Sequence, residues 1–302
     1  MINQFYASSF LWKDLLLTGM KEDLWQWDWT TLSTLKHPDQ TARAQVIAKS
    51  EGVWAANSLI SSLNLLSSEL GDPVTAKSFV KDGDLVKPGD IVSEWSGSAR
   101  SVLALERPFL NLAAYACGIA TKTHDLVSKV EKAWEKTAKK SKQTVSPKVT
   151  CTRKTLPGYR DLAIYSVLVG GGWSHRLGLS SGVLLKENHI VVAGGIPHAV
   201  EKARKFSPHG MKIEIEVTSL AELDQAIQAR ADIIMFDNFV PEQVIRGIEI
   251  VNRDAPQTVI EVSGGLNETN IESYVIEGVH ILSTGSITHS VKSTDLSLLV
   301  RY

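Results

Sequence analysis

Five side chains that are or can become positively charged lie close together near the middle of the chain. They fall in three short motifs, TRKTLPG at 152–158, GGGWSHR at 170–176 and KENH at 186–189. The five are Arg153, Lys154, His175, Arg176 and Lys186. Arginine binds carboxylate and phosphate in a bidentate manner and lysine binds them as a point charge, so such a cluster can hold several anionic groups at once. The spacing therefore predicts a site for anionic substrates.

Strands and helices alternate from about residue 149 onward. Apolar, β-branched segments occur at 183–185, 213–217, 232–236, 259–262 and 279–283, and helical sequences separate them. One helical sequence, at 219–230, opens with Ser219 and has Glu222 three residues later, which is the pattern of a capping box. This alternation predicts a parallel sheet, and the number of units predicts a barrel or part of one.

Polar and glycine-rich sequences follow the predicted strands. Active groups of α/β barrels lie at the C-terminal ends of the strands, with phosphate usually bound after the last two. Glu216 and Asp237–Asn238 end two strands, and Ser263–Gly265 and Thr284–Ser286 end the last two. Backbone N–H groups of such loops can hold a phosphate, although a plain turn explains either loop taken singly. A P-loop is absent, and the glycines at 170–172 lack the setting of a dinucleotide fingerprint.

Two carboxylates and two histidines admit more than one interpretation. Glu216 and Asp237 are either ion-pair partners of nearby cations, or they bind ribose hydroxyls and a Mg²⁺ ion that bridges diphosphate oxygens. A transition metal is not indicated, because no His/Cys cluster stands beside them. A lone histidine is more often structural, but the setting of His175 favours a hydrogen-bond donor to a carboxylate. His189 is interpreted as structural.

Composition excludes several classes of protein. The 302 residues suffice for one large domain or two, and 43% hydrophobic residues suffice for an ordinary core. A net charge of −1 gives no general attraction to nucleic acid or to an anionic membrane. Two cysteines, Cys117 and Cys151, form no disulfide framework, so a reducing cytoplasm is the expected compartment. The first twenty residues are not typical of a signal peptide, and no uninterrupted apolar run is long enough to span a bilayer.

The N-terminal part is predicted to be a mixed α/β unit. Apolar spacing predicts a helix within Thr41–Leu70, turn motifs predict short strands within Val80–Val92, and an apolar helix is predicted over Ala99–Trp134. Arg107 is a charge inside that apolar helix, and such a residue is generally paired and often faces an interface or a site. Seven lysines between 129 and 148 favour a solvated helix end and linker over a nucleic-acid patch, because no aromatic ladder accompanies them.

As a set, these motifs resemble those of the quinolinate phosphoribosyltransferases, or carboxylating nicotinate-nucleotide pyrophosphorylases. Further segments resemble the family's elements, namely 21–24 with 28–31, 106–111 with 118–121, 237–238 and 263–265. The resemblance covers most of the chain. It implies an N-terminal open α/β sandwich with an interface helix at 1–122, packed on a C-terminal incomplete parallel α/β barrel at 123–302. It also allows the N-terminal strands to pack on the C-terminal end of the chain.

The resemblance also implies an activity and an assembly. The reaction joins quinolinate to 5-phosphoribosyl-1-diphosphate, releases pyrophosphate and carbon dioxide, and leaves nicotinate mononucleotide. The implied assembly is a homodimer or homohexamer whose active site is shared across the dimer. No nucleic acid and no membrane are implied as partners.

Each expected site residue is assigned to a part of the substrates by the same resemblance. The quinolinate carboxylates and the phosphates are expected to face Arg107, Thr152, Arg153, Lys154, His175, Arg176 and Lys186. The ribose and Mg²⁺ are expected to face Glu216 and Asp237, with the metal bound directly or through water or substrate. The 5′-phosphate is expected to bind Ser263, Gly264, Gly265, Thr284, Gly285 and Ser286. The expected catalytic residues are Lys154, Lys186, Glu216 and Asp237, because charges beside the ribose stabilise the departing diphosphate and an oxocarbenium-like state.

The sequence departs from the family pattern at a few positions. Trp25, Trp27 and Trp29 crowd a turn that normally contains glycine. Ile164 stands where a basic residue is common, and Ser174 stands where asparagine usually precedes His-Arg. The last departure could change the orientation of His175.

Three other functions compete with the implied one. A nicotinate phosphoribosyltransferase would bind one carboxylate fewer and would not decarboxylate. A molybdenum-transport-associated homologue would share the barrel but act on an unknown substrate, and a regulator would bind phosphate without catalysis. The complete Arg153–Lys154 and His175–Arg176 pairs favour a dicarboxylate. A regulator could lose Glu216, Asp237 or Lys186, and all three are present.

Overall fold

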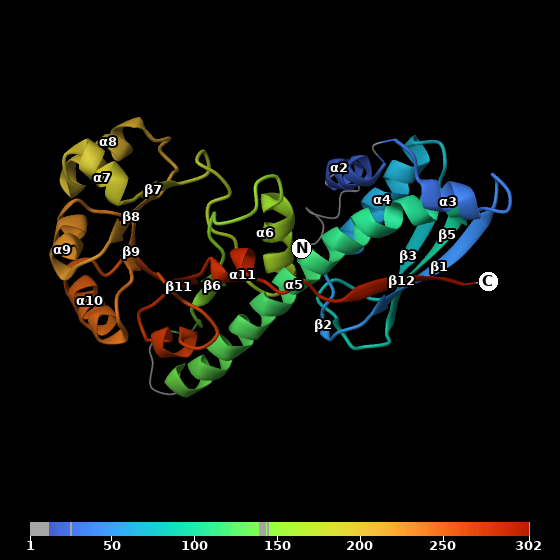
Figure 1. The fold of residues 1–302 in the computed structure, drawn as a ribbon. Coiled ribbons are helices and arrows are strands. Elements are labelled where there is room, and N and C mark those ends of the chain that lie inside the picture. Colours follow the sequence, from blue (N-terminus) through green and yellow to red (C-terminus); the bar gives the residue numbers. More distant parts are fainter. Residues whose placement is uncertain (1–11, 25, 139–142, 144, 302) are drawn as a thin grey trace. The chain divides into compact units, whose positions relative to one another are not determined.

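The computed structural model describes residues 12–24, 26–138, 143 and 145–301 (Figure 1). The chain divides into two compact units. The first contains the chain up to His124, the segment Gly158–Gly171 and the chain from Val291, and the second contains Asp125–Pro157 and Gly172–Ser290. The boundary expected at 122/123 lies inside a helix that runs from one unit into the other, and two later segments return to the first unit.

Four antiparallel strands form the main sheet of the first unit, in the order β12-β1-β5-β3. Their bounds are β1 Thr41–Ala48, β3 Val74–Ser78, β5 Ile91–Ser98 and β12 Leu296–Arg301, and a small second sheet pairs β2 Gly52–Val53 with β4 Leu85–Val86. The helices of this unit are α2 Lys13–Asp23, α3 Trp29–Thr34, α4 Asn57–Glu69, α6 Arg160–Val169 and the first part of α5 Ala99–Ala138. Because β12 pairs with β1, the C-terminal end of the chain packs on an N-terminal strand, as the resemblance allowed.

The helix predicted within Thr41–Leu70 is only partly correct. Helix α4 occupies the second half, but Thr41–Ala48 is strand β1. Ala44, Val46 and Ala48 are fully buried, so this segment has the two-residue period of a strand. Its backbone pairs with β5 on one side and β12 on the other, and β12 lies about 250 residues away in sequence. Pairing with such a distant strand overrode the local pattern.

Helix α5 was predicted over 99–134 and extends over 40 residues. By length and composition alone it could cross a membrane, as could the core helix of many soluble proteins, and 61% of its most apolar window is buried. Phe109, Ala113 and Ala116 on this helix are fully buried in the hydrophobic core of the first unit. Phe109 packs edge-on against Trp95 of β5, with ring centroids 5.0 Å apart. The apolar surface of the helix is therefore used for folding.

Six parallel strands form the sheet of the second unit, in the order β6-β11-β10-β9-β8-β7. Their bounds are β6 Lys148–Thr150, β7 Val183–Leu185, β8 Ile213–Val217, β9 Ile233–Asp237, β10 Val259–Ser263 and β11 Ile281–Ser283. The connecting helices are α7 Glu187–Ala193, α8 Ile196–Phe206, α9 Leu220–Gln228, α10 Pro241–Asp254, η1 Ile271–Tyr274 and α11 Ser286–His289. Among the described residues β6 and β7 do not pair with each other, so the barrel is incomplete and the predicted mixed α/β class is confirmed.

Strand register determines which side chains share the interior of this incomplete barrel. Glu216 of β8 is level with Met235 of β9, and Met235 is level with Glu261 of β10. Side chains two residues apart point to the same face of a strand, so Glu214 accompanies Glu216 and Ser263 accompanies Glu261. These side chains line the cavities of the unit, so their face is the interior one.

Candidate active site

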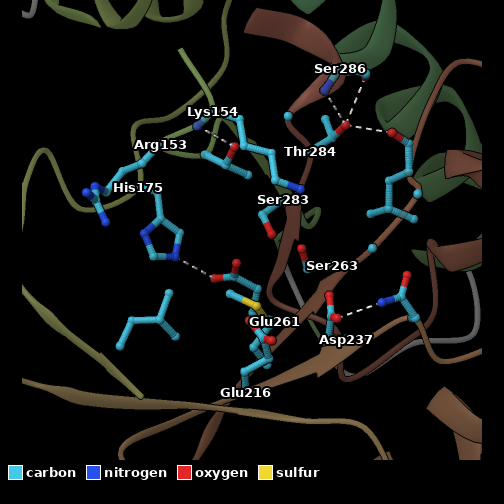
Figure 2. Close-up of a pocket in the computed structure, with 18 of the residues that line it drawn as sticks. Arg153, Lys154, His175, Glu216, Asp237, Glu261, Ser263, Ser283, Thr284 and Ser286 are labelled. Carbon is cyan, nitrogen blue, oxygen red and sulfur yellow. Dashed lines mark hydrogen bonds and ion pairs between the residues drawn. The ribbon is translucent and has the colours of Figure 1, made fainter. Parts of the chain in front are cut away.

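A cavity of about 730 Å³ opens in the second unit where the parallel strands end (Figure 2). Every expected binding residue except Arg107 lines it. Arg107 is exposed on helix α5 in the first unit. The expected catalytic residues Lys154, Lys186, Glu216 and Asp237 all face the same space. The rule that barrel chemistry gathers at the C-terminal strand ends thus located the cavity from sequence.

Arg153 and Arg176 form the part of the wall that is richest in unpaired positive charge. The Nε atom of each guanidinium is buried without a hydrogen-bond partner in the described part of the chain. Burial lowers the pKa of Arg176, and the neighbouring charge of Arg153 lowers it further. Two arginines held close to each other with donors left over are arranged to receive anionic groups from outside the chain.

The loop that carries His175 and Arg176 is fixed to strand β6. Trp173 N donates to Val149 O at 2.8 Å, and Cys151 N donates to Trp173 O at 3.3 Å. The ammonium group of Lys148 lies 3.6 Å from the centroid of the Trp173 ring, a cation–π contact. The glycines before Trp173 let the chain turn back alongside β6, and Gly171 has a φ of +85°. His175 and Arg176 are thereby placed beside Arg153.

Carboxylates occupy the opposite side of the cavity (Figure 2). Lys186 Nζ contacts Glu216 Oε2 at 2.8 Å, and Asn238 Nδ2 donates to Asp237 Oδ2 at 2.6 Å. Burial raises the pKa of Asp237 and the negative charge of Glu216 raises it further, while Lys186 and Lys154 lower it. The two carboxylates are thus close enough to repel each other. Oxygen donors in this arrangement suit ribose hydroxyls or a hard divalent cation.

Two glycine-containing loops close the end of the cavity beyond β10 and β11. Gly264 has a φ of +94°, and a Cβ built there would lie 2.6 Å from the backbone N of Asn238. The position therefore requires glycine on both counts. In the other loop, Ser286 N donates to Thr284 Oγ1 at 3.1 Å, and Thr284 Oγ1 donates to Leu266 O at 2.6 Å. These bonds fix the conformation of the loop, and its residues Thr284–Ser286 line the cavity.

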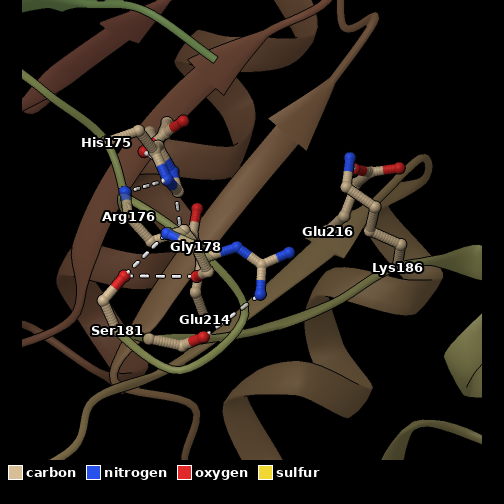
Figure 3. Close-up of polar contacts among 9 residues, drawn as sticks. His175, Arg176, Gly178, Ser181, Lys186, Glu214 and Glu216 are labelled. Atoms are coloured by element: carbon tan, nitrogen blue, oxygen red, sulfur yellow. Dashed lines mark hydrogen bonds and ion pairs between the residues drawn. The ribbon is translucent and has the colours of Figure 1, made fainter. Parts of the chain in front are cut away.

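Sequence reasoning missed two buried glutamates, Glu261, which lines this cavity, and Glu214, which lines a neighbouring one. His175 Nε2 lies 3.3 Å from Glu214 Oε2 and 3.4 Å from Glu261 Oε2 (Figures 2 and 3). The side chains of Glu214 and Glu261 are 7% and 1% exposed. A signal was present, because the two-residue period of a strand places Glu214 on the face of Glu216 and Glu261 on the face of Ser263. His289, to which the sequence analysis gave no role, also lines the cavity.

Opposing effects act on the His175 ring. Burial lowers its pKa, but the hydrogen bonds and charges of Glu214 and Glu261 raise it to about 10. The backbone N–H of Arg176, however, donates to Nδ1 at an N–N distance of 2.7 Å. A pKa of about 10 calls for a doubly protonated ring, but two hydrogens do not fit in that N–N gap. While the Arg176 N–H donates to Nδ1, the ring is therefore neutral with its single proton on Nε2, and the contact distance decides the assignment. Both ring nitrogens contact protein groups in this structure, and His175 also lines the cavity.

His175, Glu214 and Glu261 have the spacing of a metal site, since their donor atoms lie within 4.8 Å of one another. A histidine that binds a metal through Nε2 carries its proton on Nδ1 and donates it to a neighbouring group. Here Nδ1 accepts a hydrogen bond instead. The geometry therefore favours hydrogen bonding from His175 to the two carboxylates over a metal between them.

Two family models match nearly the whole chain. Residues 28–117 match the N-terminal domain of quinolinate phosphoribosyl transferase, and residues 119–299 match its C-terminal domain. The chain belongs to this family. A probable nicotinate-nucleotide pyrophosphorylase [carboxylating] from Bacillus subtilis is 36% identical over 95% of this chain and 92% of its own length. The nicotinate-nucleotide pyrophosphorylase [carboxylating] of Homo sapiens is 32% identical over 94% and 90%. The crystal structure of NadC from Streptococcus pyogenes superposes with a TM-score of 0.84 and 34% identity, covering 98% of this chain and 99% of the other.

The departures from the family pattern that the structure describes do not line the 730 Å³ cavity. Trp27 and Trp29 are 64% and 73% exposed in the first unit, with ring centroids 6.3 Å apart, and Trp25 lies outside the described residues. Ile164 is buried in helix α6. Ser174 lines a second cavity of about 560 Å³ that also touches His175, Arg176 and Glu261. The 730 Å³ cavity is therefore lined by every expected binding residue except Arg107.

Proposed function

We propose that this member of the quinolinate phosphoribosyltransferase family transfers the phosphoribosyl group of 5-phosphoribosyl-1-diphosphate to quinolinate. One carboxylate is lost as carbon dioxide, and the product is nicotinate mononucleotide, a precursor of NAD. The observation that carries the choice of acid is the pair Arg153 and Arg176, whose buried Nε groups have no partner in the described chain. Two such cations suit the two adjacent carboxylates of quinolinate, one arginine for each.

The charges around the cavity suit both halves of the reaction. The pyridine nitrogen attacks C1 of the ribose as diphosphate leaves, so positive charge develops on the ribose and negative charge on the leaving group. Glu216 and Asp237 would face the positive charge on the ribose, and Lys154 and Lys186 would face the negative charge on the diphosphate. Lys186 is 2.8 Å from Glu216 before substrate binds, so it is held near both groups. After the transfer, the quaternary nitrogen stabilises the carbanion that loss of the adjacent carboxylate leaves on the ring.

Mg²⁺ fits the carboxylate side of the cavity. The donor atoms available are oxygens of Glu216 and Asp237, and a hard cation of this kind prefers oxygen ligands and keeps several waters or substrate oxygens. Burial and then the negative charge of Glu216 raise the pKa of Asp237, and a bound cation would offset both effects. When bound, Mg²⁺ would neutralise charge on the diphosphate. Glu216 and Asp237 would hold it directly or through water or substrate.

The first unit would contribute through an assembly of subunits. Arg107 is exposed on helix α5, and no ion pair links it to a carboxylate in the described residues. We expect a homodimer, or a homohexamer built from such dimers, in which Arg107 of one subunit completes the site of its partner. A cytoplasmic location fits the two unpaired, buried cysteines.

The test is to incubate the protein with quinolinate, 5-phosphoribosyl-1-diphosphate and Mg²⁺, and to measure nicotinate mononucleotide and carbon dioxide together. Equal amounts of the two products are expected. Replacing quinolinate by nicotinate tests the competing function, because that acid gives the same nucleotide without carbon dioxide. Efficient use of nicotinate, with no reaction of quinolinate, would overturn the proposal.

A further inference from the structure

We infer that Glu214 and Glu261 are positioning residues, which hold the His175 ring so that its Nδ1 fixes the backbone of Arg176 and, through it, the guanidinium that receives substrate. The inference rests on the proposed function for the nature of the anion that Arg176 binds. Neither glutamate carries a role among the residues assigned to substrate above. They act through His175, which both carboxylates contact, rather than by touching the reacting atoms.

The two carboxylates project from strands that are separated by one strand of the sheet. Glu214 is on β8 and Glu261 is on β10, with β9 between them, and both point into the barrel interior. Their Oε2 atoms converge on the same atom, His175 Nε2, at 3.3 and 3.4 Å. A side chain on a loop is therefore held from two strands of a rigid sheet, which fixes the ring more tightly than either contact alone.

The other nitrogen of the His175 ring contacts the backbone of Arg176. With Nε2 occupied by its proton and directed at the carboxylates, Nδ1 presents a lone pair, and the Arg176 backbone N–H donates to it at 2.7 Å. The guanidinium of the same residue is held separately, because Nη1 donates to Gly182 O at 3.1 Å. The loop around Gly182 is closed by Ser181, whose Oγ accepts from Gly178 N at 3.0 Å (Figure 3). Arg176 is thus fixed at both ends, while its Nε stays buried and without a partner.

Packing alone does not explain why Glu214 and Glu261 are buried in the barrel. Glu214 Oε1 and Glu261 Oε1 are buried and have no hydrogen-bond partner among the described residues. Buried carboxylates that are only partly satisfied are worse for stability than apolar side chains of similar size. A barrel interior selected only for stability would place leucine or methionine here. The two glutamates therefore serve the residue they contact, which lies at the wall between the two cavities.

The test compares removal of the hydrogen-bond acceptor with removal of the charge only. Glu214→Leu and Glu261→Leu should each raise the KM for quinolinate about 10- to 100-fold, the range for losing a charged hydrogen bond. The KM for 5-phosphoribosyl-1-diphosphate should change less than about threefold, because its site lies elsewhere in the cavity. Glu214→Gln and Glu261→Gln keep an acceptor oxygen and should restore most of the affinity. Ile281→Val, at the position of β11 level with Glu261, is the matched control and should leave both constants unchanged. The inference would be overturned if the leucine variants raised the KM values of both substrates equally, or if the glutamine variants bound quinolinate no better than the leucine variants.

A spectroscopic measurement on the unchanged protein keeps the inference testable if the leucine variants fail to fold. The ¹⁵N shifts of the His175 ring, assigned by comparison with His175→Gln, should show a proton on Nε2 and none on Nδ1. A ring protonated on Nδ1, alone or together with Nε2, is incompatible with the contact to Arg176 and would overturn the inference. Calorimetric titration with quinolinate separates this failure from failure of the proposed function. A protein that binds quinolinate through this arrangement but forms no nucleotide would refute only the proposed function.

Discussion

Arg153 offers a direct measurement of how the cavity selects a dicarboxylate. Its buried Nε has no hydrogen-bond partner, and no ion pair joins it to a carboxylate in the described chain. Replacing it by methionine keeps much of the volume and leaves no carboxylate without a partner. Arg176→Met is the companion variant, and Arg204→Met, at an exposed arginine away from this cavity, is the control. Replacing Arg153 should therefore change substrate binding more than it changes the stability of the protein.

The size of the effect follows from the burial of the two guanidinium groups. Removing one partner of a buried, hydrogen-bonded charge pair costs roughly 2–5 kcal/mol, which is about 30- to 4000-fold in kcat/KM. In the unchanged protein, nicotinate lacks one carboxylate and leaves one arginine unpaired, so it should be poorer than quinolinate by a factor in this range. One of the two arginines binds the carboxylate that quinolinate has and nicotinate lacks. When that arginine is replaced, kcat/KM for quinolinate should fall by this factor, and kcat/KM for nicotinate should not. The ratio of the two kcat/KM values should then fall to within about tenfold of unity.

Nicotinate mononucleotide is the product from either acid, so one chromatographic assay measures both rates, and released carbon dioxide reports quinolinate alone. We expect the ratio to collapse in one of the two arginine variants, to persist in the other, and to be unchanged in Arg204→Met. A ratio near unity in the unchanged protein, or a ratio that neither variant alters, would refute the assignment of one arginine to each carboxylate.

Four further outcomes are expected. Chelation of Mg²⁺ should abolish turnover while calorimetry still detects quinolinate, and full activity in excess EDTA would remove the metal's role. Arg107→Ala and Lys186→Ala should each be inactive, yet co-refolding them should return roughly a quarter of the activity if half of the dimers are mixed and each has one intact site; no recovery despite proven subunit exchange would exclude a shared site. Gly264→Ala should raise the KM for 5-phosphoribosyl-1-diphosphate and lower the Tm, because alanine at positive φ costs about 1–2 kcal/mol before any clash; an unchanged Tm would contradict this. Burial raises the pKa of Cys117 from its ordinary 9.0 to about 12 and that of Cys151 in the same direction, so neither thiol should react with a thiol reagent at pH 8 until the protein is unfolded. Since the folded state then holds the thiol proton more tightly than the unfolded state, the free energy of unfolding should fall as the pH rises above about 9.

The second unit was largely predictable because each step of the inference was local. A short β-branched segment followed by a capped helix repeats along the chain, and the end of every such strand lies at the same edge of the sheet. Glu216, Asp237 and Gly264 could therefore be assigned to one cavity without knowledge of the register. Strand β6 was not among the predicted strands.

The features that sequence reasoning missed depend on distant parts of the chain. Strand β1 is defined by its pairing with β12, and a helical pattern over the same residues gave no warning. Segment Gly158–Gly171 belongs to the first unit although its sequence lies between two barrel segments. Glu214 and Glu261 were readable as interior positions, but only the register and the loop of His175 bring their carboxylates to one nitrogen. Convergence of this kind is a tertiary property.

The arrangement of charge explains how a chain with a net charge of −1 can offer a site for strongly anionic substrates. Five arginine and lysine side chains and four carboxylates line the two adjoining cavities, namely Arg153, Lys154, Arg176, Lys186 and Lys212 against Glu214, Glu216, Asp237 and Glu261. These side chains leave an excess of only one formal positive charge, so attraction depends mainly on where the charges stand. The cations stand on loops, where Lys154 and Lys186 are exposed, whereas Glu214 and Glu261 are buried in the barrel and directed at His175. Substrate therefore meets the positive groups first, and the buried carboxylates orient one of them instead of neutralising it.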